Sequence, residues 1–167
     1  RGAFGPRLPP DQAVPGTNLE KEIHVNRAQE ILQTPAAELN CAESACAVAN
    51  SDGAGLAYAF SDRSFLFFDE RGECHEWTVE QFLSLARREH AAANSTAELA
   101  VAWSVDPECD PTLAGYAVCV DEFTDAEELH SWFLFADGSA LVVNTEATPW
   151  ARTSVEYNEA RAIWQAS

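Results

Sequence analysis

Two ionisable side chains occupy predicted strands that are otherwise rich in apolar residues. Asp121 follows Val120, and His130 lies just before Trp132. An ionisable group among apolar neighbours is either paired or functional, because burial disfavours its charged form. In an apolar cavity, that burial would move the pKa towards neutrality and allow proton abstraction from a substrate. Asp121 and His130 are therefore the candidate acid–base residues. The alternative, which the adjacent Glu122 favours, is that both lie at solvated strand ends.

Four further side chains are candidate ligand contacts. Trp103 and Trp132 are suited to form flat aromatic walls of a pocket, although a buried tryptophan more commonly belongs to the core. Asp69 and His75 flank a turn and would face the mouth of a cavity, or they are ordinary turn residues. The sequence contains no serine-hydrolase elbow, P-loop or dinucleotide fingerprint, so we predict no cofactor.

The five cysteines indicate disulfides or buried thiols. Spacings of five and ten residues allow Cys41 to pair with Cys46 and Cys109 to pair with Cys119, which leaves Cys74 over. The sequence has no C-x-x-C, and its four histidines show no ligand spacing, so we predict no metal site. A catalytic cysteine is the remaining alternative.

Three features favour an extracellular protein. Cysteines are frequent, Asn94-Ser95-Thr96 is a glycosylation acceptor sequence, and the chain begins at Arg1 with no methionine anywhere. We therefore predict secretion, glycosylation at Asn94, and one or two disulfides.

The formal net charge is −17, from 10 basic and 27 acidic residues. A field of that sign repels nucleic-acid phosphates and anionic lipids, so neither nucleic acid nor a membrane is an expected partner. The sequence also lacks an apolar run near the ~20 residues of a membrane helix. The charge would steer the chain towards basic protein partners. Adaptation to high salt is a competing explanation, and the chain is expected to be a monomer or a homodimer.

Residues 1–16 are rich in proline and glycine and predict a flexible arm, followed by one α+β domain over 17–167. The expected helices run from a capping box at Thr17 to about residue 34, briefly after Pro35, from Thr78 to about residue 90, and after Thr153. The expected strands are 56–60, 65–68 and 74–77, and then a meander of 97–105, 115–123, 129–136 and 139–145. No internal repeat is visible.

The later strands are apolar on both faces. Trp132 and Leu134 point to one side, and Phe133 and Phe135 point to the other. An antiparallel sheet open to water has one polar face, so both faces of this sheet must be covered by helices, by curvature around a cavity, or by a partner.

The order of these elements resembles the cone-shaped α+β fold of the NTF2-like/SnoaL-like superfamily. Two segments carry the resemblance: 67–83, with an acidic turn, a glycine and then a helix, and 132–143, with an aromatic strand, an Asp-Gly turn and a second strand. The proline arm, the paired cysteines and the terminal helix depart from that family. The resemblance implies a curved antiparallel sheet of about four to six strands, packed with two or three helices around an apolar pocket.

The predicted function is binding of a small apolar molecule in such a pocket, with isomerase, dehydratase or cyclase-type acid–base chemistry as an extension. The alternative is a secreted, disulfide-stabilised effector or inhibitor that acts by binding another protein. A filled core with an exposed aromatic patch would favour the second function.

Overall fold

The computed structural model describes residues 24–35, 38, 40–50, 54–104 and 111–167. Its helices are α1 (Arg27–Leu32), η2 (Ala42–Ser44), α2 (Val79–Glu89), α3 (Thr96–Trp103), α4 (Pro111–Val118) and α5 (Ser154–Ala166). Its strands are β1 (Ala45–Asn50), β2 (Gly55–Phe60), β3 (Phe65–Asp69), β4 (Cys74–Trp77), β5 (Asp121–Thr124), β6 (His130–Leu134), β7 (Ser139–Asn144) and β8 (Pro149–Thr153). No helix among these residues is long and apolar enough to cross a membrane.

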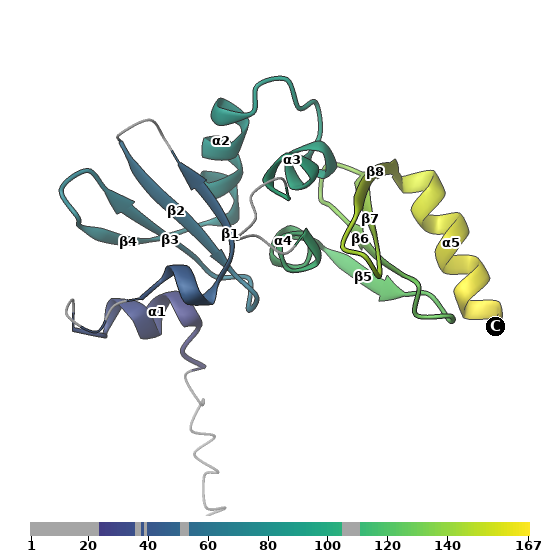
Figure 1. Ribbon diagram of the computed structural model, residues 1–167, viewed down its shortest axis with the longest axis horizontal. Helices are drawn as coiled ribbons and strands as arrows, with labels where there is room; N and C mark the ends of the chain where they lie inside the picture. The colour runs from purple at the N-terminus through teal and green to yellow at the C-terminus, as the bar shows by residue number, and fades with distance from the viewer. Residues whose placement is uncertain (1–23, 36–37, 39, 51–53, 105–110) are drawn as a thin grey trace, which may run out of the picture.

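The strands form two antiparallel sheets, with the orders β1-β2-β3-β4 (the first sheet) and β5-β6-β7-β8 (the second sheet). Figure 1 shows α3 and α4 between the two sheets, α1 against the first sheet, and α5 on the far side of the second. The predicted α+β class with an antiparallel sheet and packed helices is confirmed. The structure divides the strands between two sheets, and a cone is not shown.

The largest hydrophobic cluster joins the two sheets through the helices between them. The first sheet contributes Ala57 and Phe65, α3 contributes Leu99, and the second sheet contributes Phe133 and Leu141. A second cluster packs α1 on the other face of the first sheet, and a third packs α5 on the other face of the second sheet. Helices therefore cover both faces of the second sheet, as its two apolar faces predicted.

The predicted strands over 97–105 and 115–123 are wrong. The structure has α3 and α4 there, and only β5 is extended. Ser95 caps α3 by accepting a hydrogen bond from the backbone N–H of Glu98, and Pro111 begins α4. Both helices are apolar on nearly every side because they lie between two sheets, so the helical period that normally separates helix from strand is missing.

The other predicted elements are largely confirmed. Strands β2, β3, β4, β6 and β7 lie where the aromatic runs placed them, and Thr78 and Thr153 cap α2 and α5 with complete capping boxes. The box at Thr17 lies outside the described residues, as do residues 1–16. Asn26 is the N-cap of α1, with Gln29 as its capping-box partner. Strand β8 was not predicted, because Pro149 and Arg152 hide its extended pattern.

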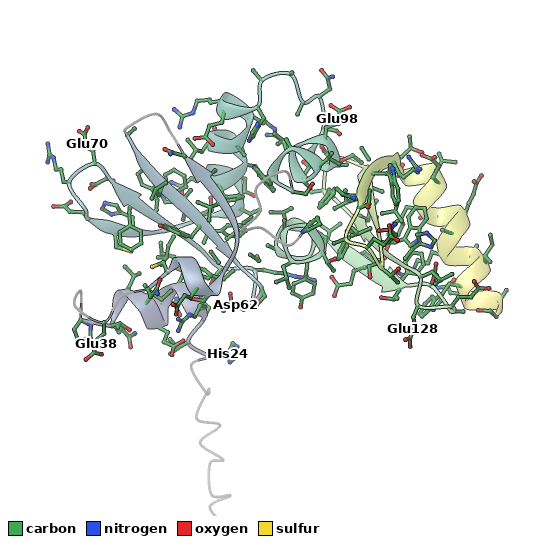
Figure 2. All side chains as sticks on the ribbon, in the orientation of Figure 1. His24, Glu38, Asp62, Glu70, Glu98 and Glu128 are labelled. Carbon is green, nitrogen blue, oxygen red and sulfur yellow. The ribbon has the colours of Figure 1, made fainter. Side chains whose placement is uncertain are left out.

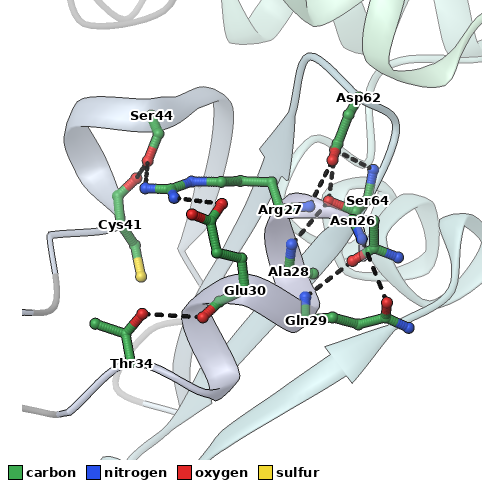
Figure 3. Close-up of polar contacts among 10 residues, drawn as sticks. All are labelled: Asn26, Arg27, Ala28, Gln29, Glu30, Thr34, Cys41, Ser44, Asp62 and Ser64. Atoms are coloured by element: carbon green, nitrogen blue, oxygen red, sulfur yellow. Dashed lines mark hydrogen bonds and ion pairs between the residues drawn. The ribbon is translucent and has the colours of Figure 1, made fainter. Parts of the chain in front are cut away.

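An internal duplication, which the sequence did not reveal, relates the two halves. The turn Phe60-Ser61-Asp62-Arg63-Ser64 recurs 75 residues later as Phe135-Ala136-Asp137-Gly138-Ser139. In the first turn, Ser64 donates to Asp62, and both side chains accept backbone N–H groups from the start of α1 (Figure 3). In the second turn, Ser139 donates to Asp137, and both accept N–H groups from the start of α3.

The same 75-residue shift relates the next turn and the next helix. Asp69 Oδ1 accepts backbone N–H groups from residues 71 and 73, and Asn144 Oδ1 accepts those from residues 146 and 148. Two buried aromatic residues, Phe82 in α2 and Tyr157 in α5, also correspond. Helix α1 with the first sheet and α2 therefore forms one unit, and α3 with the second sheet and α5 forms its counterpart.

Candidate functional site

A groove lies between α5 and the second sheet, on the side where the sheet faces away from α3. We call it the outer groove, and it encloses about 410 Å³. Its lining residues are Asp125, His130, Trp132, Val142, Trp150, Arg152, Ala160 and Ile163. None of these eight is a serine, threonine, cysteine or lysine.

The floor of the outer groove is a row of side chains across three strands. Trp132 pairs with Val142, which pairs with Trp150, so all three point to the same face of the sheet. Phe123 continues the row under α5, where its ring lies parallel to that of Trp132 at a centroid distance of 6.1 Å. Large apolar groups in one cross-strand row form a continuous surface, so the groove offers an aromatic floor.

One end of the outer groove is acidic. The imidazole Nδ1 of His130 lies 2.8 Å from Oδ2 of Asp125, and Oδ1 of Asp125 accepts the backbone N–H of Leu129 at 2.8 Å. Burial opposes ionisation of Asp125, but the hydrogen bonds from His130 and Leu129 outweigh it and lower its pKa. Glu127 and Glu128 project from the same β5–β6 hairpin, and Figure 2 shows Glu128 pointing into solvent.

The other end of the groove holds Arg152. Its Nε lies 3.7 Å from Oε1 of Glu156, one turn into α5. That carboxylate also completes the capping box by accepting the backbone N–H of Thr153. The arginine therefore faces a partner carboxylate within the chain, and the groove runs from an acidic end to a neutralised one.

Asp121 lies apart from His130. It forms an ion pair of 2.7 Å with Arg161, which also donates to the phenol oxygen of Tyr157. Burial and the nearby Asp121 carboxylate raise the pKa of Tyr157 to about 12. Asp121 lines none of the pockets described here, so the two candidate acid–base residues do not share a site.

The four candidate ligand contacts also separate. Trp132 lines the outer groove, whereas Trp103 is 3% exposed and packs against Phe82 in the core. Asp69 and His75 do meet, with 3.4 Å between Oδ2 and Nε2, but on an exposed turn rather than at a cavity mouth. Together with Glu73 they form the one trio among the described residues whose ligand atoms are close enough to hold a metal ion.

The predicted disulfides are not present among the described residues. Cys41, Cys46, Cys74 and Cys119 all carry thiols, and Cys109 lies outside the described residues. The Cys41–Cys46 pairing is wrong because the first sheet separates the two: Cys41 packs with α1, and Cys46 packs on the α2 side. Burial raises the pKa of Cys74 to about 11 and, with the adjacent Glu122, that of Cys119 to about 12. Such thiols are weak nucleophiles at neutral pH.

The glycosylation candidate Asn94 is exposed in the connection between α2 and α3. Thr96, the third residue of that acceptor sequence, is 2% exposed at the start of α3. Glycosylation and secretion stay predictions, and the thiols remove the disulfides from their support.

A second concave region, the central cleft, lies between the two halves and encloses about 480 Å³. Its walls include Phe65, Val79 and Leu83 from the first half and Ala117 and Val118 from α4. Arg63 reaches across it to form a 2.7 Å ion pair with Glu122, and its guanidinium stacks on the ring of Tyr116.

Exposed apolar side chains surround the outer groove. The exposed fraction is 38% for Trp150, 73% for Ile163 and 39% for Trp164. The sequence analysis assigned Ile163 and Trp164 to the terminal helix but missed their role as a surface. A helical projection of residues 154–166 would have identified them, because they lie three and four positions after Ala160.

No family model, no curated protein and no solved structure matches this chain. The resemblance to the NTF2-like superfamily therefore stays a prediction, and the function has to be inferred from the sites themselves.

Proposed function

We propose that this chain is a protein-binding domain that docks a basic partner on the outer groove and on the adjoining face of α5. The observation that carries the proposal is the exposure of Trp150, Ile163 and Trp164 beside one groove. Contiguous exposed apolar side chains next to a polar rim are typical of protein interfaces, and tryptophan is enriched among the residues that dominate binding energy.

The charge of the chain supports a basic partner. A net charge of −17 would accelerate association with a cationic protein and would oppose association of two copies of this chain. An inhibitor or effector that acts by surface complementarity, without catalysis, would use such a surface. The composition of the groove agrees, because its lining residues include no side-chain hydroxyl or thiol that could serve as a nucleophile.

Site-specific photo-crosslinking in source cells tests this proposal. A benzophenone side chain at position 163 should give one discrete adduct with a protein of high isoelectric point. The same group at position 56, an exposed leucine of the first sheet, is the matched control and should not give that adduct. The purified partner should then bind with an affinity that falls as salt rises. Equal crosslinking from both positions, or a partner insensitive to salt, would contradict the proposal.

A second candidate function is binding of a small apolar molecule, and the central cleft favours it. The cleft's volume of about 480 Å³ lies within the range of ligand sites, and Phe65, Leu83 and Val118 make its walls apolar. Native mass spectrometry of the freshly purified protein would detect a bound molecule. Replacement of Leu83 by Arg should abolish such an adduct, whereas Ile163→Arg, outside the cleft, should leave it unchanged.

A further inference from the structure

The two ends of the outer groove differ in charge, and this difference restricts what the groove accepts. At the acidic end, the side chain of Asp125 is 28% exposed and so is accessible from solvent. At the other end, Glu156 lies beside Arg152. The tryptophan row lies between the two ends. A ligand group that fits the acidic end must therefore be cationic and must tolerate aromatic neighbours.

A guanidinium group meets both requirements. It is planar, stacks on indole rings, and can donate two parallel N–H groups to one carboxylate. Building on the proposed function, we infer that the partner anchors itself with an arginine side chain, which lies across Trp132 and Trp150 and brings its guanidinium to Asp125.

Charges around Asp125 agree with a cationic anchor. Glu127 and Glu128 lie on the same hairpin and add negative potential at this end of the groove. His130 already holds Oδ2 of Asp125, so the arriving guanidinium shares or takes over that oxygen. Ile163, on the opposite wall, is 73% exposed and would be covered by the aliphatic part of the partner.

Two peptides test the anchor directly: blocked Leu-Arg-Leu and the same peptide with citrulline, which keeps the shape of arginine but lacks its charge. Binding is followed through the indole N–H signals of the tryptophans in ¹⁵N-labelled protein. The arginine peptide should shift the signals of Trp132 and Trp150 in a saturable manner and leave that of the core residue Trp103 unchanged. The citrulline peptide should bind at least fivefold more weakly.

Two protein variants separate a local contact from overall charge. Asp125→Asn should weaken the arginine peptide at least fivefold, while its amide oxygen still accepts the N–H of Leu129, so the hairpin is kept. Glu146→Gln removes the same charge from the exposed β7–β8 turn and should leave the affinity within twofold. A preserved two-dimensional NMR spectrum verifies that each variant is folded.

Three results would overturn the anchor: equal binding of the citrulline peptide, equal binding of a Leu-Lys-Leu peptide, or unchanged affinity in Asp125→Asn. If position 163 still crosslinks a basic protein and Asp125→Asn does not weaken that complex, the arginine anchor is wrong while the proposed function stands. If position 163 gives no protein adduct, the proposed function itself fails.

Discussion

Removing the carboxylate of Asp137 should destabilise the fold by about 2 kcal/mol, because this side chain ties a turn of the second sheet to the start of α3. One oxygen accepts the backbone N–H and the hydroxyl of Ser139, at 3.1 and 2.6 Å. The other accepts the backbone N–H of Thr96, the first residue of α3, at 2.7 Å.

The magnitude follows from these three hydrogen bonds. In Asp137→Ala, the N–H of Thr96 loses its partner in a residue that is only 2% exposed, which costs about 1–3 kcal/mol. Loss of a negative charge at a helix N-terminus adds about 0.3–1 kcal/mol. The aspartate itself is exposed, so water replaces part of the lost bonding and places the net effect near 2 kcal/mol.

Urea denaturation measures this effect. With a slope of about 2 kcal/mol per molar urea, the midpoint of Asp137→Ala should fall by about 1 M. Glu127→Ala, which removes an exposed carboxylate with no hydrogen bond in the described part of the chain, is the control and should shift the midpoint by less than about 0.25 M. A shift of that small size in Asp137→Ala would refute the role assigned to the turn.

Three further results are expected. Asp62→Ala should also lower the urea midpoint, since Asp62 makes the equivalent contacts to α1, and unchanged stability would contradict the duplication of this turn. Although burial opposes ionisation of Asp137, its hydrogen bonds lower its pKa, so its contribution to stability is present above about pH 4 and is lost as the pH falls further. Acid titrations of wild type and Asp137→Asn should therefore converge at low pH, and parallel curves would exclude this linkage. Gly115→Val should cost about 2 kcal/mol in thermal or urea unfolding, because even a Cβ at Gly115 would lie 2.9 Å from the ring of Phe133; a neutral result would show that α4 can move away from the sheet.

Local patterns predicted the elements whose environment is one-sided. Helix α2 has one apolar face and a capping box at Thr78, and both signals are readable in the chain. Helices α3 and α4 failed because burial on several sides removes the period, so Ala97–Ala100 resembles a strand as much as a helix. The rule that an ionisable residue among apolar neighbours is paired or functional found His130 and Asp121, but it could not say that Arg161 neutralises one and Asp125 binds the other.

The outer groove depends on contacts that are distant in sequence. Trp150 was missed because it lies on the unpredicted β8, and its neighbour Trp132 is 18 residues earlier in the chain. The register of the second sheet brings them together. Side-chain type alone indicated an aromatic site near Trp132, and only the pairing of three strands shows its floor.

The recurrence of two turns and a capped helix at a constant spacing points to descent from a shorter ancestral gene that was copied and fused. The ancestral polypeptide would have buried its greasy side by pairing with a twin, and that association would have become permanent once the copies shared one chain. Freed from self-recognition, the outward surface of the later copy could then diverge towards a new target.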